Sequence, residues 1–566
     1  MLFRSETKVL DEYGNHTQNR KYSPSEWSDY YREQIESRLE SAKHETVKPQ
    51  KVLQIPGWFN QLKIFIRRDV LSKLANQQYV LINFLEAPLL AFILSFLVRF
   101  YNTDEFLRHG YIFGENENIP AYLFMAVVVA LFIGLTVSAE EIIKDRKIRK
   151  REKFLNLSNS SYLMSKIVIL FVLSAVQTMM FVLIGNSILG IKGMWFDYWL
   201  VLFSVSCFAN LLGLNVSSAF NSAITIYILI PFLIIPQLLL SGVLVKFDKL
   251  NPSVTEQGVV PFWGEVMVSR WGFEALAVNQ FVNNKYERLF YSFEKNFEQA
   301  DFKTIYWLER INKKIERIKS NGGKKDLIKQ QNTDLKLLKT ELKREQAEAS
   351  KNGYPLRFPE FSKISITDNG NVSDVNGLSF LSMWLNNEYK TFFNRQSNYY
   401  RYDCKDAVVM ALEKKDFAAL NSIVAGQKGI GNKSEYVEFA KNAFEQMDNY
   451  DSIPFYSFQL DYSNQALADL VKNKNDLSDK ILERNSKLIQ RSNPIFLNPE
   501  NNTGRAHFFA PVKNLGGLSF NTFYFNICVI WFMSIVLGIT LYFDVLRKML
   551  DYLSNGLGFI VRRKSK

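Results

Sequence analysis

Residues 120–152 read PAYLFMAVVVALFIGLTVSAEEIIKDRKIRKRE, an uncharged apolar stretch that turns abruptly into a highly charged one. The uncharged part, Pro120–Ser138, is about as long as a helix must be to cross the hydrocarbon core of a bilayer. The charged part, Lys144–Lys153, holds seven Lys or Arg residues and two acidic ones. A membrane span followed by such an excess of positive charge predicts that this end faces the cytoplasm.

Five further segments pass the same length test, so we predict an all-α membrane protein with six transmembrane helices. The six segments are roughly Tyr79–Val98, Pro120–Ser138, Ser165–Leu189, Tyr198–Ala219, Ile224–Val245 and Phe523–Phe543. The mean hydropathy of the 566 residues is only −0.09, because a long polar region offsets these apolar runs. The apolar runs exclude a purely soluble protein.

Basic residues also predict the orientation of the other segments. The tail Arg547–Lys566 holds six basic residues and one acidic residue, and Lys63–Lys73 holds four and one. The positive-inside rule then places both termini in the cytoplasm and residues 246–521 outside it, for a multi-pass protein of the cell (inner) membrane. We interpret the net charge of +13 as orientation and contact with membrane lipids, and we expect no nucleic acid partner.

The sequence divides into five parts. They are a polar cytoplasmic segment (1–56), an amphipathic interfacial helix (57–76), the first five spans (77–283), a mostly α-helical extracytoplasmic insertion (284–516), and the sixth span with a basic tail (517–566). Within the insertion, two apolar stripes on either side of Asn321-Gly322-Gly323 predict a helical hairpin. Further helix-like patterns cover residues 406–420, 435–447 and 465–489.

Few residues suit catalysis or metal binding. Three cysteines and four scattered histidines predict no metal site and no catalytic residues. The segment GQKGIGNKS, residues 426–434, resembles a phosphate-binding loop, but Asn432 separates Gly431 from Lys433 and moves the lysine out of register. We interpret this segment as a turn, so the chain is predicted not to be an enzyme by itself and to bind no cofactor.

Two sets of charged residues have alternative interpretations. Glu86 lies inside the first span, where an ionisable residue is either functional or paired with a basic residue near the inner face. The charged residues from Glu140 to Glu152 form a helical extension of the second span. That extension is either a rigid lever toward a cytoplasmic partner or only an anchor of topology.

Four stretches together resemble the permease half of white-type (G-subfamily) type-2 ABC transporters. They are Glu140 with the charged segment 145–152, the fourth span with its flanks (Asp197–Ser222), Ser241-Gly242-Val243-Leu244-Val245, and Arg270-Trp271-Gly272-Phe273-Glu274-Ala275-Leu276 followed by Asn279 and Phe281. The last of these is similar to an element that re-enters the outer leaflet in that family. The resemblance implies a permease subunit of an ATP-driven exporter that moves a lipidic or amphipathic substrate.

The resemblance also implies roles for particular residues and partners. The coupling residues would be Glu140, Glu141, Asp145, Arg146, Lys147 and Glu152, the substrate pathway would include Phe132, Ile133, Pro231, Phe232, Ile235 and Leu239, and the outer gate would be Val243 and Leu244. ATP and Mg would be bound by an ABC ATPase domain, either a separate subunit or an N-terminal part missing from this chain. The permease would work as a homodimer or a paired half-transporter.

Two other functions remain open from the sequence. The first is a membrane-anchored, extracytoplasmic coiled-coil scaffold, in which the spans would only tether the external helices. Alternatively, Glu86 would couple transport to an ion gradient in a carrier that needs no ATP.

Overall fold

The computed structural model describes residues 8–20, 22–37, 56–100, 110–152, 157–320, 325–367, 371–427, 430–447, 454–499 and 501–553. The chain forms two units, Met1–Gly57 and Trp58–Lys566. In the first unit, strands β1 (Lys8–Leu10) and β2 (His16–Arg20) pair antiparallel. Helix α1 (Pro24–Tyr31) begins with a capping box between Ser23 and Glu26 and leads into one π-helical turn, η2 (Arg32–Glu36).

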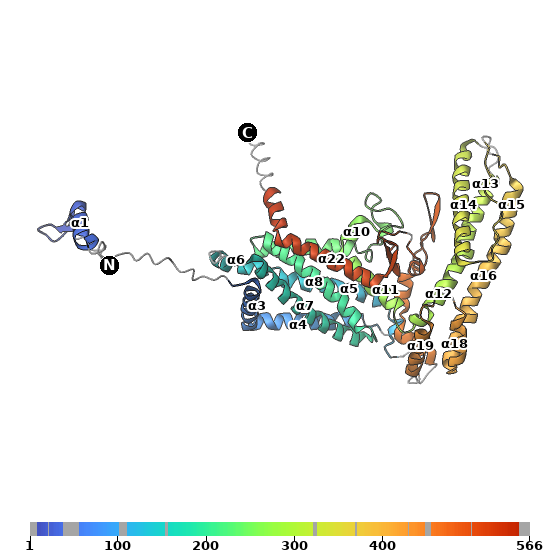
Figure 1. The fold of residues 1–566 in the computed structure, drawn as a ribbon, viewed down its shortest axis with the longest axis horizontal. Coiled ribbons are helices and arrows are strands. Elements are labelled where there is room, and N and C mark those ends of the chain that lie inside the picture. The colour runs from blue at the N-terminus through green and yellow to red at the C-terminus, as the bar shows by residue number, and fades with distance from the viewer. Residues whose placement is uncertain are drawn as a thin grey trace. The chain divides into compact units, whose positions relative to one another are not determined.

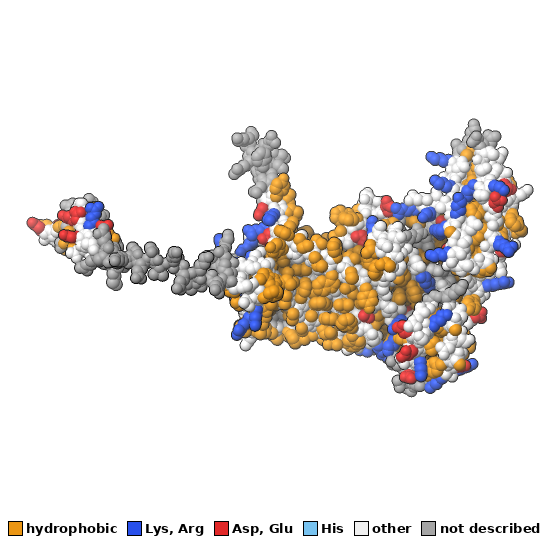
Figure 2. All heavy atoms as spheres, viewed as in Figure 1, with side chains coloured by type: hydrophobic (Ala, Val, Ile, Leu, Met, Phe, Trp, Pro, Cys, Tyr) orange, Lys and Arg blue, Asp and Glu red, His pale blue; other side chains and the backbone are white. Residues whose placement is uncertain are grey.

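The second unit contains a bundle of long apolar helices (Figure 1). Five helical segments in the described part of the chain are long and apolar enough to cross a membrane. Their helices are α4 (Gln77–Val98), α5 (Ile119–Ser138), α7 (Asn159–Leu189), α8 (Trp195–Ala219) and α22 (Thr522–Tyr542). On the face seen in Figure 2, hydrophobic side chains cover the bundle, while Lys, Arg, Asp and Glu gather toward its ends and over the insertion.

Small residues bring the central helices of the bundle together. Helix α8 packs against α5, α7 and α22. A Cβ atom built at Gly134 of α5 would lie 2.7 Å from the Cβ atom of Ala209 of α8, and one at Gly213 of α8 would lie 2.0 Å from the hydroxyl of Ser138. Glycines at these positions allow close backbone approach, as is typical of membrane helices.

The predicted span 224–245 forms a shorter helix than expected. Helix α9 (Ala223–Leu239) has 17 residues, about 25 Å in length, and the predicted continuation to Val245 is wrong. Gly242 has a φ of +79°, which an α-helix does not accommodate, and the Ser241 hydroxyl donates to the Leu238 carbonyl. The chain therefore turns after Leu239, and α9 falls below the length criterion that the other five segments meet.

Two helices flank the bundle at the end where α5 terminates. The predicted amphipathic helix is α3 (Trp58–Ala75), and the charged extension is α6 (Glu141–Glu152). At the other end, the short helix α10 (Phe262–Val266) precedes α11 (Val268–Val282), which is buried along most of its length and packs against α5, α8 and α22.

The insertion is built mainly from long helices, as the sequence predicts. The elements are α12 (Glu287–Phe302), η6 (Lys303–Trp307), α13 (Leu308–Ser320), α14 (Lys325–Asn352), α15 (Val375–Trp384), η7 (Leu385–Tyr389), α16 (Lys390–Asn398), η8 (Tyr399–Asp406), α17 (Ala407–Glu413), α18 (Phe417–Ala425), α19 (Lys433–Met447), α20 (Pro454–Tyr462) and α21 (Gln465–Val471). Helices α13 and α14 pack together, and the predicted turn at 321–323 lies outside the described residues.

Two helix predictions within the insertion are wrong in part. The pattern at 406–420 breaks between α17 and α18, where Lys415 has a φ of +57°. The pattern at 465–489 contains only α21, and β3 (Ile481–Arg484) then pairs antiparallel with β4 (Lys487–Gln490). Asn485 and Ser486 both have positive φ angles, which form a tight hairpin turn in place of helix.

The remaining short elements lie in connections between helices. They are η3 (Phe113–Glu115), η5 (Phe247–Lys249), η9 (Pro494–Phe496), and the antiparallel strands β5 (Val512–Leu515) and β6 (Leu518–Asn521), which directly precede α22.

A buried acidic pair lies where α12 meets η8 and α21. Lys405 and Lys472 donate to Glu294 at 2.7 and 2.9 Å, and these bonds and charges lower the pKa of Glu294 to about 2 despite its burial. Glu287, which lies at the start of the same helix α12, is 2% exposed. Burial, and secondarily the charge of Glu294, raise the pKa of Glu287 well above its usual value. One carboxyl of the pair is therefore stabilised as an anion and the other as an acid.

Candidate functional site

The charged helix α6 is attached to the end of α8 by its first turn. The Ser217 hydroxyl of α8 accepts hydrogen bonds from the backbone N–H groups of Ile142 and Ile143, at 3.1 and 3.3 Å. The first N–H groups of a helix have no partner within it, so a hydroxyl from another helix can satisfy them. Arg146 donates to the Ser218 carbonyl at 3.3 Å and to the Asn221 side chain.

A cluster of five charged side chains joins α6 to α3 and α7. Lys166 of α7 lies 2.7 Å from Asp69 of α3, 3.1 Å from Glu141 and 2.9 Å from Asp145 of α6. Lys73 of α3 pairs with Asp69 at 3.3 Å and with Glu141 at 3.1 Å. We call these five residues the ion cluster. It holds three carboxylates and two ammonium groups contributed by three helices.

The ion cluster is shielded from solvent. The side chain of Lys166 is 3% exposed and that of Glu141 is 6% exposed. Removing one partner from a buried ion pair leaves an uncompensated charge, which costs about 3–5 kcal/mol. The three helices are thereby fixed in one arrangement, because separating them would leave buried charges without partners.

Contacts around the ion cluster extend it along α6. The Tyr162 hydroxyl of α7 donates to Asp145 at 3.1 Å, and the Arg149 guanidinium lies 4.4 Å from the Tyr162 ring centre. Arg68 of α3 pairs with Glu152 at 2.8 Å, but both side chains are more than a quarter exposed, so this pair is weaker. Lys147 is exposed. Of the predicted coupling residues, Glu141 and Asp145 therefore belong to the ion cluster, whereas Lys147 points to solvent.

Glu140 lies in the turn between α5 and α6 and makes a different connection. Its carboxylate pairs with Lys144 at 2.7 Å and accepts a hydrogen bond from the hydroxyl of Tyr227 on α9. The junction of α5 and α6 thus contacts the helix that carries most of the predicted pathway residues.

The predicted pathway residues do not all lie on one surface. Phe132 of α5 and Phe232, Ile235 and Leu239 of α9 are 40–67% exposed, and Pro231 is exposed too. Ile133 is only 2% exposed. Adjacent residues on an α-helix point about 100° apart, so Phe132 and Ile133 face different surroundings. The structure brings α9 beside the exposed part of α5 and places Ile133 inside the bundle.

The predicted gate lies in the turn that follows α9. Val243 donates its backbone N–H to the Ser241 hydroxyl at 3.2 Å and packs against the bundle core. Leu244 is 61% exposed. The Phe247 ring fills the space beside Gly242, where a Cβ atom would lie 2.4 Å from it, so this turn has a fixed shape.

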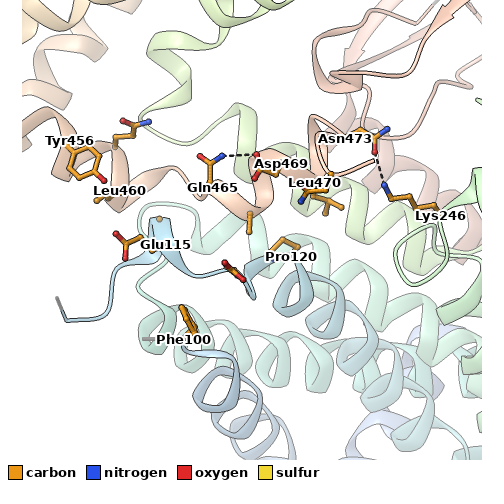
Figure 3. Close-up of a pocket in the computed structure, with 15 residues that line it drawn as sticks. Phe100, Glu115, Pro120, Lys246, Tyr456, Leu460, Gln465, Asp469, Leu470 and Asn473 are labelled. Atoms are coloured by element: carbon orange, nitrogen blue, oxygen red, sulfur yellow. Dashed lines mark hydrogen bonds between the residues drawn. The ribbon is translucent and has the colours of Figure 1, made fainter. Parts of the chain in front are cut away.

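A cavity of about 880 Å³ opens beside this turn (Figure 3). Its lining includes Phe100, Glu115, Glu117, Pro120, Lys246, Tyr456, Leu460, Asp469, Leu470 and Asn473. Lys246 donates to the Asn473 side chain at 3.0 Å. The cavity is within the size range of small-molecule sites and combines apolar walls with carboxylates.

Glu86 lies in the middle of α4 and is half-buried. Among the residues that the structure describes, none forms a hydrogen bond or ion pair with its carboxylate. The interpretation in which a basic residue pairs with Glu86 therefore finds no support in the described chain.

The Arg-Trp-Gly-Phe-Glu-Ala-Leu element forms the first half of α11 and carries a second buried ionic group. Lys513 of β5 pairs with Glu274 at 2.7 Å, and Asn526 of α22 donates to the same carboxylate at 2.9 Å. Arg270 pairs with Glu265 at 2.9 Å. Glu274 therefore fastens α11 to both β5 and α22.

The segment 426–434 has a local role in the insertion. Lys433 begins α19, and its ammonium group donates to the Ala425 carbonyl at 2.6 Å. The Ser434 hydroxyl donates to Asn432 at 2.7 Å. Residues 428 and 429 of this segment lie outside the described residues.

Sequence reasoning missed three members of the ion cluster: Asp69, Lys73 and Lys166. Each carried a signal. Lys166 is the lone charged residue of the predicted third span, and Asp69 is the lone acidic residue between Lys63 and Lys73. A basic residue inside an apolar run and an acidic residue inside a basic run each need a partner of opposite charge.

Comparisons with known proteins agree with this architecture. Residues 60–281 match the family model described as ABC-2 type transporter. An ABC transporter ATP-binding/permease protein of Mycobacterium tuberculosis is 27% identical over 229 residues, which cover 39% of this chain and 25% of that relative. The chain thus matches about a quarter of the length of this relative. The match over residues 60–281 and the long apolar helices support a multi-pass membrane protein with an ABC-2 type transporter membrane domain, consistent with a permease component.

Proposed function

We propose that this permease is the membrane-spanning subunit of an ATP-driven exporter for a lipidic or amphipathic substrate. The observation that carries the proposal is the ion cluster, which joins the charged helix α6 to α3 and α7. A helix attached in this way moves as one body with its neighbours, so a force applied to α6 reaches the membrane bundle.

The proposal requires α6 to face the cytoplasm. The excess of basic residues in α6 and after α22 supports this orientation through the positive-inside rule. Both termini would then be cytoplasmic, the membrane would be the inner membrane, and residues 246–521 would lie outside the cytoplasm.

Two connections would transmit the movement of α6. The ion cluster would carry it to α3 and α7, and the hydrogen bond between Glu140 and Tyr227 would carry it to α9. Because α9 bears Phe232, Ile235 and Leu239 on its exposed side, its displacement would change the shape of the pathway.

The energy would come from the ATP-binding component, which would bind ATP and Mg, while this chain would hydrolyse no ATP itself. A relative that is an ATP-binding/permease protein supports this division of roles. A second permease half, identical or related, would face α9, because one copy leaves the apolar side of α9 exposed. An apolar lining favours lipidic or amphipathic cargo, whose desolvation costs little.

The test replaces Glu140 with Ala in the complete assembly, reconstituted in liposomes with its ATP-binding component. We expect ATP hydrolysis to continue while ATP-dependent movement of an NBD-labelled phospholipid falls, so that transport per ATP decreases. The matched control is Glu413→Ala, which removes an exposed carboxylate from the insertion, away from α6. An unchanged transport-to-hydrolysis ratio in Glu140→Ala would contradict the coupling role.

A second candidate function rests on the unpaired state of Glu86 among the described residues. A half-buried carboxylate in the middle of a span could bind and release a proton, as the coupling group of a carrier driven by an ion gradient does. This carrier would move the NBD-labelled phospholipid in response to a pH gradient without ATP, and Glu86→Gln would abolish that movement. Dependence on ATP with no response to the gradient would exclude it.

A further inference from the structure

The hairpin formed by β5 and β6 has one apolar face and one polar face. In its register Leu515 pairs with Leu518, Lys513 pairs with Phe520, and Asn514 pairs with Ser519. Directly paired residues point to the same face of a hairpin, and successive residues alternate. Leu515, Leu518 and Phe520 therefore share one face. Asn514 and Ser519 share the other, where the Ser519 hydroxyl donates to Asn514 at 2.8 Å.

The apolar face of the hairpin is exposed in the chain as it stands. Leu515 is 50% exposed, Leu518 is 65% exposed and Phe520 is 41% exposed. A two-stranded hairpin gains little stability alone, and an exposed apolar face at its tip indicates an interaction surface. The turn Gly516-Gly517, with φ angles of +60° and +87°, is the tight type that keeps both leucines opposite each other.

The orientation of this face is set by contacts with the membrane bundle. Lys513, on the same face, reaches Glu274 of α11 at 2.7 Å. Near Gly504, whose backbone N–H donates to the Asn514 carbonyl, the Leu515 side chain lies 3.7 Å from the Gly504 Cβ position. The Phe525 ring of α22 lies 2.9 Å from the same position. These contacts hold the base of the hairpin against α11 and α22, while Leu518 and Phe520 remain exposed.

The hairpin also stands where a membrane span begins. Asn521, the last residue of β6, caps α22 through a hydrogen bond to the Phe523 N–H. Tyr524, in the first turn of α22, is 64% exposed. The exposed apolar residues of the hairpin thus stand directly before the first turn of α22, at the end of a span-length helix, where the headgroup region of a bilayer lies.

We propose that the apolar face of the β5–β6 hairpin rests in the lipid headgroup and upper acyl region beside the start of α22. Leu515, Leu518 and Phe520 contact lipid, while Asn514 and Ser519 remain in water. The lipid anchor steadies Lys513 against Glu274 and so the position of α11. This role depends on the membrane domain and not on the transport cycle, so it holds or fails independently of the proposed exporter function.

Spin labels on adjacent residues test the proposal in the full chain reconstituted in nanodiscs. The background variant is Cys528→Ser, because Cys528 is exposed whereas Cys207 and Cys404 are buried. Leu518→Cys reports on the apolar face, and Ser519→Cys is the matched control on the polar face. Each labelled protein is measured for collision with oxygen, which enters lipid, and with a water-soluble nickel chelate.

We expect the ratio of oxygen to nickel accessibility to be several-fold higher at 518 than at 519 in nanodiscs. This ratio is low for a spin label on a loop that lies in water. An equally low ratio at both positions would therefore overturn the proposal. Protection of 518 from both reagents, with dipolar broadening between labels, would identify a second copy as the occupant and would also overturn it. Leu515→Cys serves as a second probe should Leu518→Cys fail to yield monodisperse protein.

Discussion

Replacing Lys166 with Met should destabilise the permease more than any loss of a surface charge. Met keeps much of the length of the lysine side chain but has no charge, so the change creates little cavity and removes three ion pairs. Asp69 and Glu141 would then keep their pairs with Lys73, while Asp145 would lose its ion pair. The lost interaction is therefore electrostatic.

The magnitude follows from the burial of the ion cluster. Lys166 is 3% exposed, and removing one partner of a buried pair costs about 3–5 kcal/mol. At about 2–4 °C per kcal/mol, the value for a domain of about 150–250 residues, the melting temperature should fall by at most roughly 6–20 °C. Lys313, which pairs with Glu309 while both are 60% exposed, gives the matched control. Lys313→Met should cost less than about 1 kcal/mol.

The assay is thermal unfolding of the full protein in nanodiscs, followed by intrinsic tryptophan fluorescence. A double variant, Lys166→Met with Asp69→Asn, should recover part of the loss because one uncompensated carboxylate has been removed. A melting temperature of Lys166→Met within the range of Lys313→Met would refute the claim that the ion cluster fixes α3, α6 and α7.

Three further outcomes follow from other parts of the structure. Tyr227→Phe removes the hydroxyl that donates to Glu140 and should lower transport per ATP several-fold without changing the melting temperature. Transport per ATP equal to that of the unmodified protein would show that this hydrogen bond does not transmit the movement of α6. Leu244→Trp enlarges an exposed residue of the turn after α9 and should block movement of an NBD-labelled phospholipid. The control Leu477→Trp, at a fully exposed site in the insertion, should not block it. Free passage of the phospholipid in Leu244→Trp would remove Leu244 from the path. Burial raises the pKa of Glu287, so the folded protein holds a proton that the unfolded chain releases, and stability should fall as the pH rises above about 4.3. Glu287→Gln, which cannot ionise, should have the higher melting temperature by a margin that grows as the pH rises above about 4.3. A margin that is constant with pH would show that Glu287 does not titrate.

The sequence determined the class of the protein and most of the ends of its apolar helices, although α7 begins at Asn159 and not at the predicted Ser165. In a bilayer every backbone polar group must be satisfied within the segment, so an apolar run of about 20 residues has few options besides a helix. The start of α5 at Ile119 and the end of α8 at Ala219 differ by no more than a residue from the predicted bounds. The amphipathic pattern likewise located α3.

Local backbone conformation was harder to predict from the sequence. The pattern at 465–489 has helical spacing, but Asn473, Asn485 and Ser486 adopt positive φ angles and the chain forms β3 and β4 instead. The predicted continuation of α9 to Val245 failed at Gly242 for the same kind of reason. Apolar spacing reports which residues are to be buried and not which backbone path buries them.

Only the tertiary structure decided how the charged residues are used. The sequence identified Glu141 and Asp145 as coupling residues through a family resemblance, but their partner Lys166 lies 25 positions from Glu141 and 97 from Asp69. Charge attraction acts between side chains that the fold brings within a few ångströms, and no periodicity records such pairs. The sequence by itself determined that these charges stand at the end of a span; the packing of α3 and α7 against α6 determined that they form one buried cluster.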